Sequence, residues 1–124
     1  MDLRIAGTNV PESLWQEFGR LTNHATLSIG SVRYERENRR LSFRLSRRHS
    51  RGKYVTAEVT VRNVISCEIA DHAGPDFPEV DLLFGVTVQN REVFLSSVEE
   101  DRGTNLFVVS AKVDGFDVEL RDAE

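Results

Sequence analysis

Beyond Ala25, apolar and polar residues alternate along most of the chain. This period of two is typical of strands that bury one face and expose the other. The alternation is found over residues 27–34, 41–45, 55–69, 82–95 and 109–120. The pattern therefore predicts a β-rich fold for most of the molecule.

The first part of the chain has a different period and predicts one helix over about residues 11–22. Its apolar stripe recurs at helical spacing, at Leu14, Phe18 and Leu21. Asn9 followed by Glu12 resembles a helix start, with proline in the first turn. We expect the stripe to pack on a sheet.

The first and second alternating runs predict a hairpin that turns near Asn38. A loop at residues 38–39 would place Tyr34 opposite Phe43, whereas a loop at residues 37–38 shifts the pairing by two positions and keeps the same faces. Before this hairpin the parity slips at Gly30 and Ser31. We expect a β-bulge there.

The strongest turn signal is Asp114-Gly115, which stands between two alternating runs. This dipeptide is typical of a type I′ turn. The resulting hairpin would pair Val113 with Phe116 and Lys112 with Asp117. Another long run, residues 54–69, is expected to bend at Arg62-Asn63 or to pass there into another sheet.

We therefore expect a mostly β (α+β) single domain covering residues 1–124, with residues 122–124 frayed. Its antiparallel strands, six to eight in number, would span about residues 26–121. They would form a β-sandwich or a strongly curved, partly closed sheet, with the N-terminal helix packed on it. A closed barrel with room for a small ligand is the structural alternative.

Composition agrees with a globular domain, because 40% of the 124 residues are hydrophobic and 29% are charged. No apolar stretch is long enough for a membrane helix, and the first residues do not resemble a secretory signal. Cys67 is the single cysteine, which excludes an internal disulfide. These features favour a cytoplasmic protein.

Charge is distributed unevenly along the chain. Residues 33–53 hold nine of the sixteen basic residues and only two acidic ones, whereas residues 68–124 hold fourteen acidic residues and four basic ones. Strand parity places part of the basic segment in one outward row, and the rest in the loop that follows. The candidate binding residues are Arg33, Arg40, Arg44 and Arg48 in the row, and Arg51 and Lys53 in the loop.

Such a row indicates contact with an anionic partner, although charge runs also form ordinary solvated faces. Alternate strand residues are about 6.6–6.8 Å apart, which resembles the spacing of phosphates along one nucleic-acid strand. However, Tyr34 and Phe43 fall on the apolar face, so no aromatic platform accompanies the arginines. The acidic second half also disfavours nucleic acid.

The sequence gives only weak signals for metal binding and for catalysis. The loop residues Asp71, His72, Asp76, Glu79 and Asp81 carry metal-binding groups, but their spacing fits no calcium or zinc motif. Cys67 has the parity of a small core residue. No motif of a catalytic nucleophile or a phosphate-binding loop is present. We therefore predict no catalytic residues, no metal and no cofactor.

The function expected from the sequence is that of a non-catalytic interaction domain whose basic hairpin engages an acidic protein surface. One alternative is a homodimeric structural module with charge-complementary halves. The other is a β-barrel whose lumen holds a small apolar ligand or, instead, an enzymatic site.

Overall fold

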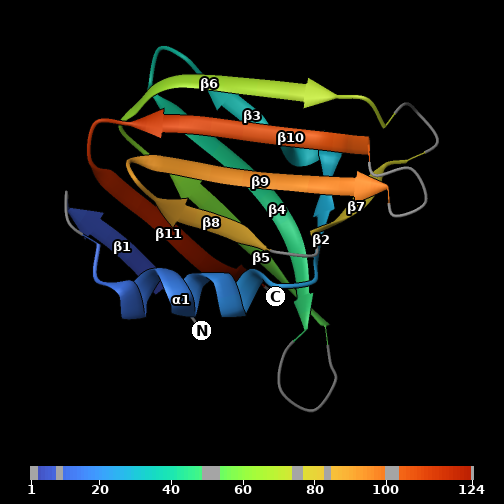
Figure 1. Cartoon of the computed structure of the whole chain (residues 1–124), viewed down its shortest axis with the longest axis horizontal. Coiled ribbons are helices and arrows are strands. Elements are labelled where there is room, and N and C mark those ends of the chain that lie inside the picture. The colour runs from blue at the N-terminus through green and yellow to red at the C-terminus, as the bar shows by residue number, and fades with distance from the viewer. Residues whose placement is uncertain are drawn as a thin grey trace.

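The computed structural model describes residues 3–7, 10–48, 54–73, 77–82, 85–99 and 104–123. Two antiparallel sheets face each other, and one helix lies along their side (Figure 1). The sandwich predicted from the alternating pattern is therefore confirmed.

The larger sheet has seven strands. Their order is β1 (Leu3–Gly7), β11 (Phe116–Ala123), β5 (Tyr54–Val61), β4 (Arg40–Arg48), β2 (Ala25–Ser28) and β7 (Glu79–Leu82), and β3 (Arg33–Glu35) also pairs with β4. The smaller sheet has the order β6 (Val64–Asp71), β10 (Thr104–Val113), β9 (Glu92–Glu99) and β8 (Val86–Gln89). Eleven strands in the described residues exceed the six to eight expected, because β1, β3 and β7 are too short to show a clear alternation.

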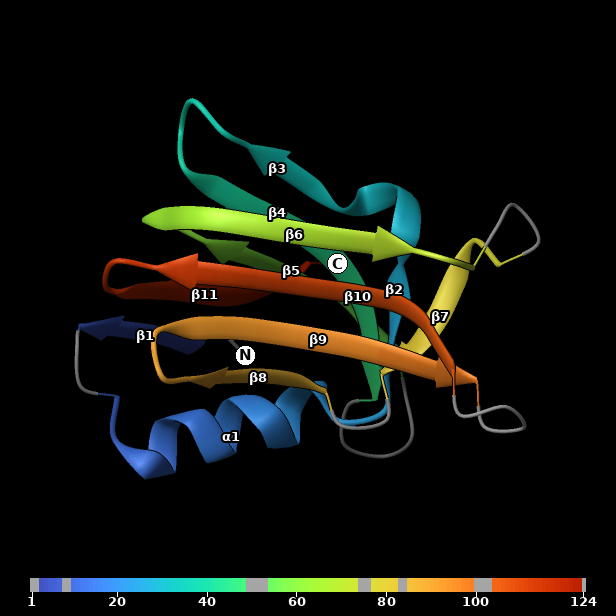
Figure 2. The same cartoon turned by 45° about the horizontal axis from the view of Figure 1, so that its top comes forward.

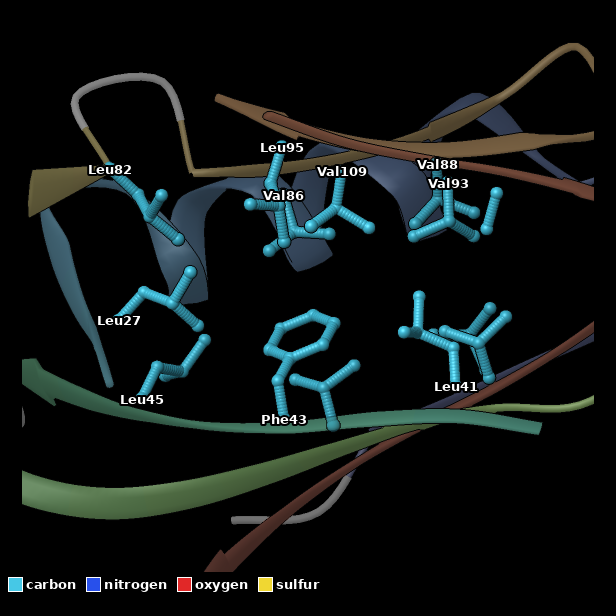
Figure 3. Packing of buried hydrophobic residues seen from close by; sticks show 14 of the residues in the cluster. Leu27, Leu41, Phe43, Leu45, Leu82, Val86, Val88, Val93, Leu95 and Val109 are labelled. Atoms are coloured by element: carbon cyan, nitrogen blue, oxygen red, sulfur yellow. The ribbon is translucent and has the colours of Figure 1, made fainter. Parts of the chain in front are cut away.

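The core lies between the two sheets and is built from the alternating apolar positions. Figure 3 shows Phe43 of β4 pointing toward Val86 and Val109 of the opposite sheet. Each of these three side chains is at most 1% exposed. Side chains of both sheets thus meet in the interior, as in a sandwich.

Helix α1 (Glu12–Thr22) closes one lateral side of the sandwich, next to β8 and β1 (Figure 2). Phe18 and Leu21 of the predicted stripe are buried, while Leu14 is half-buried. Pro11 occupies the cap position, and no side chain of the described residues forms a cap hydrogen bond. The expected cap residue, Asn9, lies outside the described residues.

The hairpin near Asn38 adopts the second of the two predicted registers, with Tyr34 opposite Leu41. The β-bulge expected before it is wrong, because a 3-10 helix produces the change of parity instead. A short 3-10 helix, η1 (Ile29–Ser31), lies between β2 and β3, and the pairing with β4 shifts by three residues across it, from Leu27 opposite Leu45 to Tyr34 opposite Leu41. A shift by an odd number of residues moves the apolar residues from one parity to the other.

The hairpin predicted at Asp114-Gly115 is wrong. β10 pairs with β6 and β9, while β11 pairs with β1 and β5, so this turn carries the chain from one sheet to the other. Both strands turn the same set of residues toward the common core, and the alternation is therefore identical to that of a hairpin. The left-handed conformation expected of a type I′ turn occurs instead at Asn90 (φ 53°) and Arg91 (φ 57°), between β8 and β9.

The chain also changes sheets at Arg62-Asn63, as the sequence predicted. The two crossings lie side by side and are joined by backbone hydrogen bonds. The Arg62 amide donates to the Asp117 carbonyl at 2.9 Å, and the Asp114 amide donates to the Asn63 carbonyl at 3.0 Å. The junction of the two sheets is thereby fixed at this end.

Strand β11 continues through Ala123, so the expected fraying from Asp122 onward is wrong for Asp122 and Ala123. Glu124 lies outside the described residues. The Asp122 carboxylate accepts two hydrogen bonds from Arg47, from Nε at 2.9 Å and from Nη2 at 2.6 Å. This ion pair holds the end of the strand in place.

Candidate functional site

The candidate binding residues of the row lie on the outer face of the seven-stranded sheet. Cross-strand pairing places Arg33 opposite Ser42, and Arg44 opposite Glu58. Arg40 is opposite Glu35 at the hairpin end. Directly paired residues of antiparallel strands share a face, so the three arginines share the outer surface.

A hollow of about 300 Å³ opens on this face, between η1 and β4. It forms because the chain leaves the sheet for three residues at η1, so that part of β4 has no neighbouring strand on this side. Its lining consists of Gly30, Ser31, Arg33, Ser42, Phe43, Arg44 and Glu58.

Ser31 fixes the wall of the hollow. Its Oγ accepts a hydrogen bond from the Arg44 amide at 2.8 Å and donates to the Ser28 carbonyl at 2.7 Å. The side chain thus replaces a missing strand-to-strand hydrogen bond, because Arg44 has no β3 residue as its neighbour. The backbone around the hollow is held in one conformation.

A second hollow, of about 390 Å³, shares Gly30, Ser31 and Arg44 with the first. It extends across the sheet toward Thr56 of β5 and Glu79 of β7. We refer to the two hollows together as the arginine groove. The groove is polar and open to solvent along the outer face of the sheet.

The three arginines differ in how firmly they are paired. Arg40 donates to both carboxylate oxygens of Glu35, at 3.0 and 2.9 Å. Hydrogen bonds from Asn38 and Arg40 lower the pKa of Glu35. Arg40 therefore belongs to a stable pair at the hairpin end.

Arg44 and Arg33 retain donors for a partner. The Arg44 Nε lies 3.8 Å from the Glu58 carboxylate, which is too long for a hydrogen bond, and the Arg44 side chain is 68% exposed. Within the described part of the chain, Arg33 makes no side-chain hydrogen bond or ion pair. The sequence predicted both residues as candidates but not the groove between them.

The remaining candidates are only partly placed by the structure. Arg48 ends β4 opposite Tyr54. Arg51 and Lys53 lie outside the described residues. The sequence did not indicate Tyr54 as part of the row, yet this residue is 67% exposed on the face that Arg44 and Glu58 share. Its even position on β5, which it shares with Thr56 and Glu58, is the sequence signal that indicates this outer face.

Arg47 belongs to the basic segment but points into the molecule. Its side chain is 5% exposed and pairs with Asp122, whose pKa the Arg47 hydrogen bonds lower. Odd parity on β4, shared with Phe43 and Leu45, indicates this inward direction. Arg47 therefore has a structural role and is unavailable to a partner.

Acidic residues of the C-terminal half lie on the same sheet, beyond β5. Asp117 on β11 is 3.2 Å from Arg4 and 3.6 Å from Arg62. Glu119 is 3.5 Å from Arg121. The far half of the outer face is thus internally ion-paired, whereas the groove lies on the half that carries Arg33 and Arg44.

The described residues give no geometric support for the candidate metal site or for Cys67 as a nucleophile. In the residues that the structure describes, no three metal-binding side chains gather; Asp76 of the candidate loop lies outside them. Cys67 is half-buried rather than fully in the core, and burial, followed by the charge of Glu68, raises the pKa of its thiol. A raised pKa makes a poor nucleophile.

No protein-family model, curated protein or solved structure matches this chain. In the described ranges, no helix has the length and apolar character needed to cross a bilayer. The geometry of the arginine groove is therefore the main guide to function.

Proposed function

We propose that the protein is a non-catalytic cytoplasmic binding module whose arginine groove engages carboxylates of an acidic protein partner. The observation that carries the proposal is the position of Arg33 and Arg44 on either side of a surface hollow, both with donors to spare. Ser42 lies between them, directly opposite Arg33 and two residues before Arg44 on β4.

Diagonal neighbours of this kind are about 7–8 Å apart. Long arginine side chains at this separation can both donate to one carboxylate placed between them. Guanidinium groups bind carboxylates in a planar, two-donor geometry, which gives direction as well as attraction. The groove therefore suits an aspartate or glutamate side chain of a partner.

Tyr54 extends the same surface with an exposed aromatic ring. Tyrosine and arginine are the residue types that most often contribute strongly to protein–protein contacts. Together with Arg33 and Arg44, the ring would let a partner segment add apolar contact to its charge contacts. This combination favours a protein over a simple anion.

Nucleic acid is less well supported as the partner. Glu58 lines one part of the groove and Glu79 the other. These carboxylates would repel a continuous row of phosphates, whereas a single carboxylate can avoid them. The chain as a whole also has a net charge of −4.

The two alternatives have less support than the groove. Asp117 and Asp122, acidic residues of the second half, are already paired with arginines of the same subunit. This leaves fewer charges for a charge-complementary homodimer. A lumen for a small ligand lacks support, because side chains of the two sheets meet in the core.

The test is binding of a fluorescent, glutamate-rich decapeptide by anisotropy at low salt. The double variant Arg33→Ala/Arg44→Ala should bind roughly two- to thirtyfold more weakly, since each exposed charge pair contributes about 0.2–1 kcal/mol. The matched control, Arg4→Ala/Arg20→Ala, removes two charges from side chains 60% and 66% exposed outside the groove. Equal losses of affinity in both variants would show that peptide binding depends on net charge and not on the groove.

A single-stranded oligonucleotide of the same charge serves as the second probe. We expect the wild-type protein to bind the peptide more tightly than the oligonucleotide at equal ionic strength. The opposite order, with loss on Arg33→Ala/Arg44→Ala, would replace the acidic protein by nucleic acid as the partner.

A further inference from the structure

The two lateral sides of the sandwich differ. Helix α1 packs beside β8 on one side, whereas β6 on the other side pairs with β10 alone among the described strands. Of the eight residues of β6, only Val64 is buried and Cys67 is half-buried; the other six are exposed. One edge of the smaller sheet thus presents its backbone to solvent.

Strand β6 has few of the features that usually protect an edge, since Glu68 and Asp71 are its only charged residues. Its sequence, Val-Ile-Ser-Cys-Glu-Ile-Ala-Asp, contains no lysine and no proline. A register irregularity is confined to the end near Val64. Ile65 and Ile69 are 57% and 45% exposed, and both are among the largest exposed apolar side chains of the described residues. An edge of this composition favours pairing with another strand.

We propose that β6 pairs antiparallel with β6 of a second copy, about a two-fold axis at Cys67. The two four-stranded sheets would then become one continuous sheet of eight strands. This inference concerns a different surface from the arginine groove and goes beyond the proposed function. It is supported by the self-complementary sequence of the strand.

The axis must pass through a residue. Along a strand, backbone N–H and C=O groups point alternately toward one neighbour and the other. The backbone groups of two directly opposite residues point either both toward the shared seam or both away from it, so residues paired between identical strands have the same parity. The possible centres in the middle of β6 are therefore Ser66, Cys67 and Glu68.

Only the centre at Cys67 places the isoleucines opposite each other and keeps acidic residues from facing acidic residues. It places Ile65 opposite Ile69 of the second copy, twice, and Ser66 opposite Glu68. A centre at Glu68 would place two glutamates opposite each other and Ile65 opposite Asp71. A centre at Ser66 would place Ile69 opposite a residue beyond the end of the strand. Opposed apolar pairs stabilise a sheet and opposed like charges destabilise it.

The axis makes a prediction that oxidative cross-linking can test. Cys67 is the only cysteine of the chain. In the proposed dimer the two Cys67 residues are directly opposite, with Cα atoms about 4.5–5.5 Å apart. This separation is within the range of a disulfide. We expect copper–phenanthroline to convert the wild-type protein to a covalent dimer, at a pH near 9 because of the raised pKa of the thiol.

The matched control moves the cysteine by one residue, in the double variant Cys67→Ser/Glu68→Cys. In the proposed register the two new cysteines are offset by two positions, about 6.8 Å along the strands, so their Cα atoms exceed the roughly 7 Å limit. This variant should cross-link at least tenfold more slowly. Faster cross-linking of the control, or equal rates, would overturn the axis at Cys67.

Sedimentation equilibrium tests the dimer without any cross-link. We expect wild-type protein to dimerise with increasing concentration and Ile65→Lys/Ile69→Lys to remain a monomer with an unchanged circular-dichroism spectrum. Phe94→Lys is the matched control, since Phe94 is 37% exposed on another strand. Its dimerisation should equal that of the wild type. A wild-type monomer up to millimolar concentration would overturn the proposal.

Two further measurements separate this dimer from the other interactions. It should persist at 0.5 M NaCl, unlike a dimer held by charge-complementary halves. It should also persist in Arg33→Ala/Arg44→Ala. Dissociation of the dimer in either experiment would overturn a dimer formed by β6 alone. Loss of peptide binding with the dimer intact would test only the arginine groove and would leave the β6 dimer unaffected.

Discussion

At the scale of single residues, Gly85 has the most demanding position. Its φ is +68°, in the region that favours glycine. A Cβ atom there would lie 2.6 Å from Thr22 Oγ1 and 2.9 Å from the Asn23 amide. The Thr22 hydroxyl donates to the Phe18 carbonyl at 2.9 Å and accepts from the Val86 amide at 2.8 Å. The end of α1 and the start of β8 thus meet at this glycine.

We predict that Gly85→Ala lowers the free energy of unfolding by roughly 2–4 kcal/mol, from left-handed strain and overpacking together. Urea denaturation followed by circular dichroism measures the change. The control is Gly19→Ala in α1, where an added Cβ meets no atom within 4 Å. It should raise the stability by about 0.5–1 kcal/mol. Similar losses in both variants would contradict the close contact at Thr22.

At the scale of elements, the Arg47–Asp122 pair joins β4 to β11 across β5. Both residues face inward at one end of the core, with side chains only 5% and 15% exposed. A buried pair adds little net stability compared with apolar residues, but removal of one partner leaves a buried charge. The pair therefore affects the free energy of unfolding most when one partner is removed.

The pair also sets the response to acid. Hydrogen bonds from Arg47 hold the pKa of Asp122 below its usual range, so folding favours the ionised carboxylate. Its contribution is fully present above the unfolded pKa, about 3.9, and is lost as the pH falls through the lower folded pKa. We expect Asp122→Asn to cost roughly 3 kcal/mol at pH 7 and much less near pH 2. Thermal unfolding across pH 2–7 measures this; a constant difference would contradict the linkage.

The elements differ in how well their sequence predicted them. Helix α1 and the strands around Phe43 and Val59 follow from periodicity, since each period matches one pattern of burial. Strand β6 was expected to continue the odd parity of β5, with Ile65 and Ile69 facing inward. Its position at an edge leaves both isoleucines exposed, which no local pattern indicates.

At the scale of the whole molecule, the first strand pairs with the last. Ile5 on β1 is fully buried and lies opposite Val118 of β11. The two ends of the described chain thus form one part of the seven-stranded sheet, and the core is continuous from Ile5 to Leu120. This arrangement predicts a single cooperative unit.

We predict that Ile5→Ala destabilises the whole protein by about 2–5 kcal/mol, as expected for a buried isoleucine. Unfolding followed by Trp15 fluorescence and by circular dichroism should give coincident transitions. Arg4→Ala, at an exposed neighbouring position, should change the stability by less than about 1 kcal/mol. Separate transitions in the Ile5→Ala variant would show that β1 unfolds independently.

The candidate site was predictable only in part. Parity placed Arg33, Arg40 and Arg44 on one outward face, and this depends on the strand period alone. The groove depends on η1 leaving the sheet, and the availability of each arginine depends on residues distant in sequence. Glu58 is too far to hydrogen-bond Arg44, whereas Glu35 holds Arg40 firmly.

The sequence by itself determined the helix and the longer strands, the inward and outward faces of most strands, and the uneven charge along the chain. These properties follow from periods of two and 3.6 residues, which are local. Only the tertiary structure decided which strands pair, as the change of sheet at Asp114-Gly115 shows. An alternating run buries the same side chains whether its neighbour lies in the same sheet or in the opposite one, and only the packing of the whole chain distinguishes them.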